Sequence, residues 1–212
     1  MPVATATVKG AGKAWSKVLT KATGKEVVVN AASIGNGIMA SITKLLENIP
    51  KILKAIPFLP NSVADGAEDI VTTLYTYLDD AVKAASSKVL GKVANVLSNA
   101  LVILKVVTVV GAGVDAWGNA ETILGITEEA TVGQRIIATL IAVANALIPV
   151  LGNLIPNKTL VNIFMKIAPK LGIDVSSLEE QRARAAAELD KYNKDNNTEL
   201  TIEEYNQMNG KA

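Results

Sequence analysis

The feature that most constrains this chain is an uncharged apolar run from Ile136 to Asn157. It is about 22 residues long, close to the roughly 20 residues that a helix needs to cross the hydrocarbon of a bilayer. A second apolar run, Val93 to Val114, has a similar length and contains a single charge, Lys105. Two such segments joined by a short connector are typical of a helical hairpin. We therefore expect a hydrophobic helical hairpin, 93–114 and 136–157, at the centre of the fold.

The composition favours helices. Hydrophobic residues make up 50% of the 212 residues but aromatic residues only 4%, so the apolar character comes mainly from Ala, Val, Ile and Leu. We predict an all-α fold: a helical bundle around the central hairpin, with a polar C-terminal helix–turn–helix tail. The predicted organisation is an N-terminal arm and amphipathic helix over 1–60, a helical domain over 61–172 and the tail over 173–212.

Several kinds of chemistry are excluded by composition. The chain has no cysteine and no histidine, which removes disulfides, thiolate nucleophiles, imidazole acid–base catalysis and the usual zinc ligands. The net charge is +1, and basic residues are not interleaved with aromatic ones, so we expect no nucleic-acid recognition. Walker and Gly-x-Ser-x-Gly motifs are missing. We predict that the protein is not an enzyme and has no small-molecule substrate and no resident cofactor apart from the calcium discussed below.

The segment Lys44–Leu59 is predicted to be an amphipathic helix with a mildly basic polar face. Pro50 is expected to kink it or to begin its second half. Two interpretations stay open: a surface helix whose apolar side packs on the core, and an interfacial helix lying on a bilayer. The preceding run, 27–43, is rich in small residues and glycine, and we expect a flexible buried segment there.

Three sequence patterns predict helix starts. Asp65 with Glu68 predicts a capping box for a helix over 66–90, and Ser177 with Glu180 predicts one for the tail helix. Thr131 with Gln134 predicts a third box, which would begin the second hairpin helix.

Polar residues inside the hairpin are expected to face a partner helix or water. Burying a lone lysine such as Lys105 in hydrocarbon raises the free energy of membrane insertion by about 2.5–3.5 kcal/mol. We therefore expect the Lys105 side chain to face a partner helix or water, or to snorkel to the membrane surface. Trp117 is placed where an interface-seeking indole would lie, or it fills the core. Pro149 is expected to kink the second helix without ending it. The predicted hairpin residues are Asn95, Ser98, Asn99, Lys105, Trp117, Asn145 and Pro149.

The connector between the two apolar runs is acidic. Its tip residues are Asp115, Glu121, Glu128 and Glu129. The flanks are basic, with Lys88 and Lys92 before the hairpin and Lys158, Lys166 and Lys170 after it. This distribution would keep the outer ends on the cytoplasmic side of a membrane.

The tail carries one motif with ligand spacing. Its oxygen-bearing residues fall at the positions of an EF-hand calcium loop, with an aliphatic Leu200 at the centre. The first position is Asn rather than Asp, and the sixth is Thr198 rather than glycine. The alternative is a polar helix–turn–helix in which Thr201 caps the last helix and Glu204 completes the box. The candidate calcium ligands are Asn193, Asp195, Asn197, Glu199, Thr201 and Glu204.

The tail also contains an internal echo, DKYNKDNN and EEYNQMNG. With the Ala/Gly/Val-rich region before it, this tail resembles segments of tape-measure proteins from bacteriophage tails. That resemblance implies a component that leaves the tail and helps to make a path for DNA across the host membrane. The hairpin is similar in kind, without a shared motif, to the hydrophobic hairpin of colicin-type pore-forming domains.

These features predict a membrane-inserting, pore- or channel-forming helical protein, either a phage tail component for DNA ejection or a secreted toxin. Its partner would be a lipid bilayer, and several copies would associate, because two helices cannot enclose water. No Sec-type signal peptide is expected from the N-terminal sequence. The protein would be membrane-associated or in a host membrane after release, with a water-soluble form before insertion. The alternative is a soluble helical scaffold or interaction protein whose apolar hairpin is a buried core without membrane activity.

Overall fold

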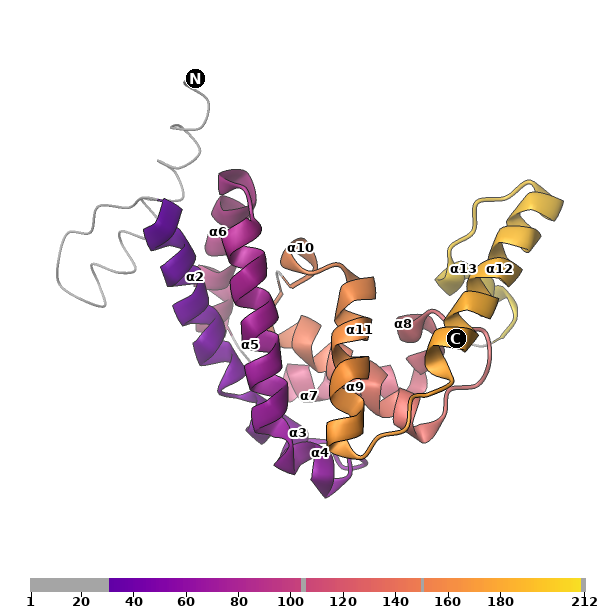
Figure 1. Cartoon of the computed structure of the whole chain (residues 1–212), viewed down its shortest axis with the longest axis horizontal. Helices are drawn as coiled ribbons and strands as arrows, with labels where there is room; N and C mark the ends of the chain where they lie inside the picture. The colour runs from indigo at the N-terminus through magenta and orange to yellow at the C-terminus, as the bar shows by residue number, and fades with distance from the viewer. Residues whose placement is uncertain (1–30, 104–105, 150, 211–212) are drawn as a thin grey trace, which may run out of the picture.

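A computed structural model describes residues 31–103, 106–149 and 151–210. In this part the chain is all-α and contains no strand. Figure 1 shows α2, α5 and α6 together at one end, α7, α9 and α11 in the middle, and α12 projecting at the other end. The elements are α2 Ala31–Leu46, α3 Ile49–Ala55, α4 Asn61–Asp65, α5 Ala67–Ala84, α6 Ser87–Ile103, α7 Val106–Gly118, α8 Ala120–Leu124, α9 Val132–Leu147, α10 Leu151–Leu154, α11 Asn157–Ile167, the 3₁₀ turn η1 Ala168–Leu171, α12 Leu178–Asn196 and α13 Ile202–Met208.

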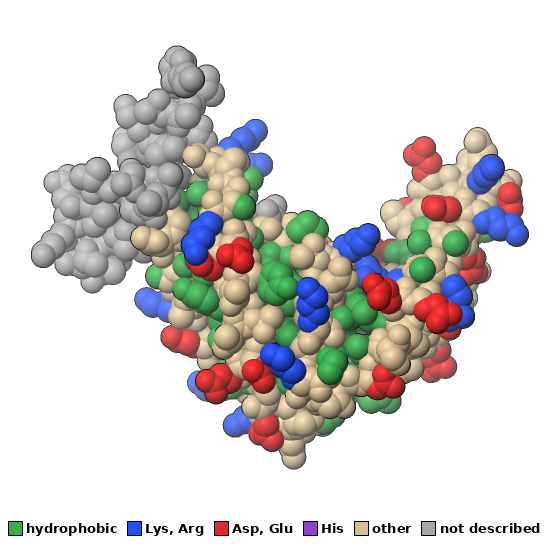
Figure 2. Space-filling view, viewed as in Figure 1, with side chains coloured by type: hydrophobic (Ala, Val, Ile, Leu, Met, Phe, Trp, Pro, Cys, Tyr) green, Lys and Arg blue, Asp and Glu red, His purple; other side chains and the backbone are tan. Residues whose placement is uncertain are grey.

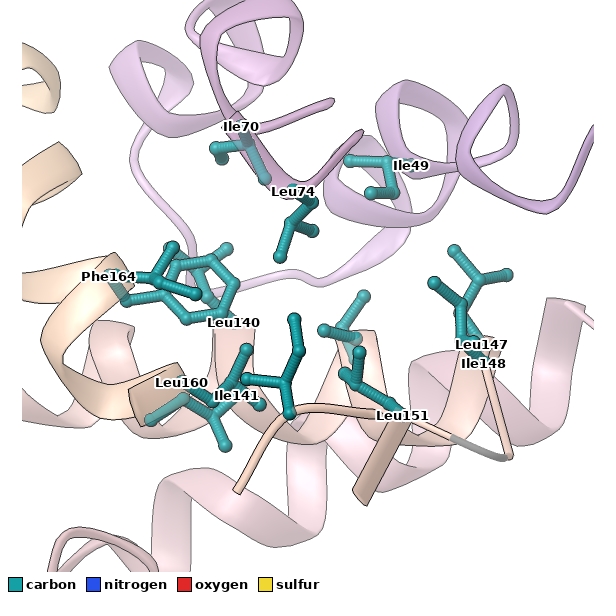
Figure 3. Packing of buried hydrophobic residues seen from close by; sticks show 14 of the residues in the cluster. Ile49, Ile70, Leu74, Leu140, Ile141, Leu147, Ile148, Leu151, Leu160 and Phe164 are labelled. Carbon is teal, nitrogen blue, oxygen red and sulfur yellow. The ribbon is translucent and has the colours of Figure 1, made fainter. Parts of the chain in front are cut away.

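Helix α9 lies at the centre of the core. Ten of its 16 residues are buried, and it packs against α7, α8, α10 and α11. Phe164 of α11, fully buried, lies close to Leu140 of α9, and Ile70 and Leu74 of α5 lie above both in the view of Figure 3. Burying leucine-, isoleucine- and phenylalanine-sized side chains contributes about 1.5–3 kcal/mol each. The fold therefore rests on covering α9.

The closest helix partner of α9 is α7, and Gly113 lets the two approach. A Cβ atom at this position would lie 2.8 Å from Ile56 Cδ1 and 3.1 Å from Val143 Cγ2. The Thr139 hydroxyl of α9 donates a hydrogen bond to the Gly113 carbonyl, 3.3 Å away. The polar Thr139 side chain is thereby satisfied inside an apolar contact.

The second apolar run is not one helix. Helix α9 ends at Leu147, and Ile148 leaves the helical region with φ −119° and ψ 84°, because the residue before a proline is disfavoured there. The short α10 follows, and Pro156 separates it from α11. The expectation that Pro149 only kinks a helix running through Asn157 is therefore wrong. The first apolar run, 93–114, falls in two helices, α6 and α7. Residues 104–105 between them lie outside the described part.

The amphipathic pattern is confirmed, but the segment is divided at residues 47–48 and its helical part ends at Ala55 rather than at Leu59. Helix α2 ends at Leu46 and α3 begins at Ile49, with the proline in its first turn. The apolar positions of the stripe are at most 2% exposed, while the charged ones face out, which fits the surface-helix interpretation. The stripe consists of Leu45, Leu46, Ile49, Ile52, Leu53 and Ile56.

Two further expectations for the N-terminal half are corrected. Much of the segment expected to be flexible, 27–43, belongs to α2, which buries Ile34, Ile38 and Ile42 against α5 and α6. The helix expected over 66–90 ends at Ala84, since Ala85 is extended, and α6 begins at Ser87.

One of the three predicted capping boxes is confirmed. Thr131 and Gln134 form a complete capping box at the start of α9. The box at Asp65 is absent, because Asp65 is the last residue of α4 and Gly66 precedes α5. Helix α12 begins where Ser177 predicts, but Ser177 has helical backbone angles and makes no side-chain cap.

Candidate functional site

The connector between α7 and α9 is organised by Arg135, in the first turn of α9. Its guanidinium donates to the Trp117 carbonyl at 2.7 Å, to the Ala130 carbonyl at 3.2 Å and to Glu121 Oε1 at 3.0 Å. Glu129, almost fully exposed, lies 3.8 Å from the same guanidinium. Arg135 thus joins the end of α7, α8 and the connector to the start of α9.

Glu121 of α8 is the buried member of this cluster. Its side chain is 9% exposed, and its Oε1 also accepts a hydrogen bond from the Ala130 amide at 2.8 Å. The hydrogen bonds from a guanidinium and a backbone N–H offset the desolvation cost of this carboxylate, which an isolated buried charge would bear in full. Removing one partner of such a pair costs about 3–5 kcal/mol.

The tail packs on this connector, and its first contact is made through Gln134. The amide nitrogen of Gln134 donates to Ser177 Oγ at 3.2 Å and to Gln181 Oε1, while its oxygen serves the capping box of α9. Gln181 in turn donates to Glu128 Oε2 at 3.2 Å. Arg184, one turn further along α12, forms an ion pair with Glu128 at 2.9 Å.

A second contact is built around Glu188 of α12. One carboxylate oxygen accepts from Thr127 Oγ1 of the connector and the other from Tyr205 Oη of α13, both at 2.9 Å. The hydrogen bond to Glu188 raises the pKa of Tyr205 above its ordinary value. Tyr205 also packs edge-on against Tyr192, with ring centroids 5.2 Å apart.

Asn206 makes a third contact. It is fully buried on α13, and its amide nitrogen donates to the Ile126 carbonyl at 2.9 Å. Among the described residues its Oδ1 has no hydrogen-bond partner, which makes this a strained point in an otherwise satisfied interface.

A cleft of about 550 Å³ opens between connector and tail. Figure 2 shows the tail projecting from one end of the body, with charged side chains along it. Four carboxylates and two guanidiniums line the cleft, so its net charge is negative. No group of three acidic residues in the described ranges is arranged to hold a metal ion. The arrangement can hold two segments of the chain together, through the Thr127–Glu188 hydrogen bond and the Arg184–Glu128 ion pair. Its lining residues are Gly118, Glu121, Thr127, Glu128, Glu129, Arg135, Arg184 and Glu188.

The predicted acidic tip is only partly brought together here. Glu121, Glu128 and Glu129 surround the Arg135 and Arg184 side chains, but Asp115 is exposed on α7 and takes part only through its backbone carbonyl, which accepts from Asn119. Two of the predicted tip carboxylates, Glu121 and Glu128, are thus paired with arginine side chains of the protein itself.

The predicted hairpin residues are scattered. Trp117 is half-buried and packs on Phe58, with ring centroids 4.3 Å apart. Asn145 is exposed on α9. Asn95 is exposed on α6. Pro149, also exposed, follows α9. The side chains of Ser98, Asn99 and Lys105 lie outside the described residues, and a pore lining remains a prediction.

The predicted calcium ligands form a turn between α12 and α13. The Asn193 oxygen accepts from the Leu200 amide at 2.9 Å and from the Thr198 hydroxyl at 2.8 Å. Thr201 and Glu204 form the capping box of α13, as the helix–turn–helix alternative predicts. Asp195 lies within α12 and Asn197 ends it in the left-handed region at φ 52°, while Glu199 is exposed in the turn. Calcium binding itself stays a prediction, which a calorimetric calcium titration would test.

The sequence reasoning missed Arg135 and the tail residues that meet the connector. Arg135 had a visible signal, because it is the only basic residue between Lys105 and Lys158 and follows four acidic ones in the connector. Gln181, Glu188 and Asn206 had none, since polar side chains on a polar helix do not indicate which of them meets a distant segment.

No helix in the described part of the chain has both the length and the hydropathy that a membrane span requires. Comparison with protein-family models, curated proteins and solved structures finds no match.

Proposed function

We propose that this chain is a membrane-inserting, pore- or channel-forming helical protein, folded here in the form it has before it meets lipid. In this proposal the fold is a helical bundle around a hydrophobic hairpin, α7 and α9, with a polar C-terminal tail. The amphipathic helices cover the hairpin in water, and lipid replaces them after insertion.

The observation that carries the proposal is the apolar outer face of α7. Val107 is 83% exposed and Val114 41% exposed. Gly111 and Gly118 lie between and beyond them, and a Cβ atom at either would meet nothing within 4 Å. The spacing of four, three and four residues places all four on one side of the helix. The helix directly against α9 therefore presents a narrow apolar, small-residue stripe, bordered by the exposed Thr108 and Asp115, of the kind that suits lipid or a closely packed helix.

The proposed inserted form needs more chain than α9 alone. Its 16 residues would span about 24 Å, less than the roughly 30 Å of bilayer hydrocarbon. We therefore include residues 148–157, which carry no charge. Prolines inside a membrane helix are tolerated where neighbouring helices or water satisfy the freed carbonyls.

The test is dye release from vesicles of phosphatidylcholine and phosphatidylglycerol. Val107→Asp changes an exposed side chain, so the folded protein should accept it. Its charge would cost about 2.5–3.5 kcal/mol in the hydrocarbon, which corresponds to a loss of roughly 60- to 400-fold in insertion. Met208→Asp is the matched control, because Met208 is 59% exposed on the tail.

We expect wild type and the Met208→Asp variant to release dye alike and the Val107→Asp variant to lose release. Wild-type protein that leaves vesicles intact, or equal release by the Val107→Asp variant, would contradict the proposal.

A second candidate is a helical scaffold or interaction protein. The observation in its favour is the burial of ten of the 16 residues of α9, which accounts for much of the apolar run as an ordinary core. The α7 face would then meet another protein or a second copy. In that case wild type associates in the absence of vesicles, and the Val107→Asp variant stays monomeric in sedimentation measurements.

A further inference from the structure

We propose that the C-terminal tail, 178–208, is a latch that keeps the hairpin closed, and that its release from the connector precedes the separation of α7 from α9. The role of the latch in membrane insertion rests on the proposed function. Its structural basis is the set of contacts between tail and connector.

The tail contacts are concentrated on one part of the hairpin. They reach Ile126, Thr127 and Glu128 of the connector and Gln134 in the first turn of α9. This is the same segment that Arg135 ties to the Trp117 carbonyl. The tail therefore braces the bend of the hairpin, the place where the two helices must part if they open.

The polar contacts between the tail and the connector can break and re-form in water. Besides three buried hydrophobic side chains, Leu178, Ala185 and Tyr205, the tail is held by hydrogen bonds and one half-exposed ion pair, Arg184–Glu128. Water can replace each of these polar contacts, and a typical one changes an equilibrium by a factor of only about 2 to 13. The core around α9, by contrast, is held by buried aliphatic side chains, which have no such replacement in water. Release of the tail is thus easier than disruption of the core.

The part of α12 beyond Glu188 extends away from the body (Figure 1), and residues 190–191 and 194–196 in it are exposed. This part packs on α13, where Tyr192 meets Tyr205, and Asn193 accepts from the Leu200 amide in the turn. Segments with few buried contacts open at low free energy.

The latch can be loosened with Glu188→Ala, which removes the acceptor for Thr127 and Tyr205. Asp190→Ala is the matched control, since it deletes the same charge from an exposed position on the same helix. Tyr205→Phe is the conservative second variant, because it keeps the ring packing and removes one donor. The latch can be tightened by cross-linking Thr127→Cys to Glu188→Cys with a short reducible bismaleimide, which is selective because the chain has no cysteine.

The first readout is hydrogen exchange of the full chain in water. We expect the amides of 126–134 to exchange about tenfold faster in the Glu188→Ala variant and two- to tenfold faster in the Tyr205→Phe variant. The Asp190→Ala variant should match wild type. Unchanged exchange in both loosened variants would overturn the latch, whether or not the protein acts on membranes.

The second readout is dye release from the vesicles described above. The Glu188→Ala variant should act about tenfold faster than wild type, and the cross-linked protein should be inactive until reductant is added. Cross-linked protein that releases dye at the wild-type rate would also overturn the latch. If no form releases dye, the proposed function fails, while the exchange measurement still decides whether the tail controls the connector.

Discussion

Arg135 donates a hydrogen bond to the carbonyl of Trp117, 2.7 Å away, although 18 residues separate them in the chain. The bond joins the end of α7 to the start of α9, across the connector between them. Trp117 is in the last turn of α7, where backbone carbonyls have no intrahelical N–H partner. Its carbonyl oxygen can therefore accept a hydrogen bond from the Arg135 guanidinium. The bend is therefore held by a side chain of α9 itself, with the tail packed over it.

Arg135→Leu should be among the most damaging single changes outside the apolar core. It leaves Glu121 buried without its cation, and we expect a loss of about 3–5 kcal/mol in the free energy of unfolding. Arg184→Leu is the control, because its ion pair with Glu128 is half-exposed and is worth at most about 1 kcal/mol. Urea denaturation measures both. Equal losses in the two variants would show that the Arg135 cluster does not hold the bend.

Gly133→Ala should destabilise the start of α9. A Cβ atom there would lie 2.3 Å from the backbone carbonyl oxygen of Asp174, and overpacking of this kind costs about 1–3 kcal/mol. Gly111→Ala is the matched helical change, on the open face of α7, and we expect it to stabilise by about 0.5–1 kcal/mol. Thermal unfolding should move the two variants in opposite directions. A stabilising Gly133→Ala would mean that α9 does not start against the 172–176 segment.

Tyr205 predicts a pH dependence at the alkaline end. Its hydrogen bond to Glu188 raises the folded-state pKa above the ordinary value of 10.0. The unfolded chain therefore ionises first, so the contribution of Tyr205 is complete below pH 10 and is lost as the pH rises through the folded-state pKa. At neutral pH, Tyr205→Phe should lower the free energy of unfolding by about 1 kcal/mol. The difference between the two proteins should shrink above pH 10, and a constant difference would contradict this account.

The all-α class and most helices follow from local patterns. The stripe of Leu45, Ile49, Ile52 and Ile56 and the box of Thr131 with Gln134 are local signals, and both are present in the structure. The errors come from competition between signals. Asp65 looks like a cap, but α4 uses it as its last residue, and the chain restarts at Gly66.

Hydropathy alone also misled the interpretation of 136–157. The run is uncharged, but Pro149 and Pro156 divide it into three helices. Proline restricts the residue before it and lacks a backbone N–H, so it ends a helix in water even where the flanking residues are all apolar. The joining of connector and tail could not be predicted from the chain, because Thr127 and Glu188 are 61 residues apart. Their contact depends on the tertiary fold, and neither residue carries a local pattern that selects the other.

The central claim, that the hairpin opens to meet lipid, is tested most directly by the position of Trp117 relative to a bilayer. The chain has two tryptophans, so Trp15→Phe leaves Trp117 as a single fluorescent reporter, packed on Phe58 at the end of α7. Vesicles with bromine at defined depths along the lipid chains report where the indole lies. The account predicts a blue-shifted emission quenched most strongly by bromines near the headgroup boundary, and loss of that quenching in the Val107→Asp variant. Emission that is unchanged by vesicles of every composition, with the protein folded and Trp117 still against Phe58, would contradict it.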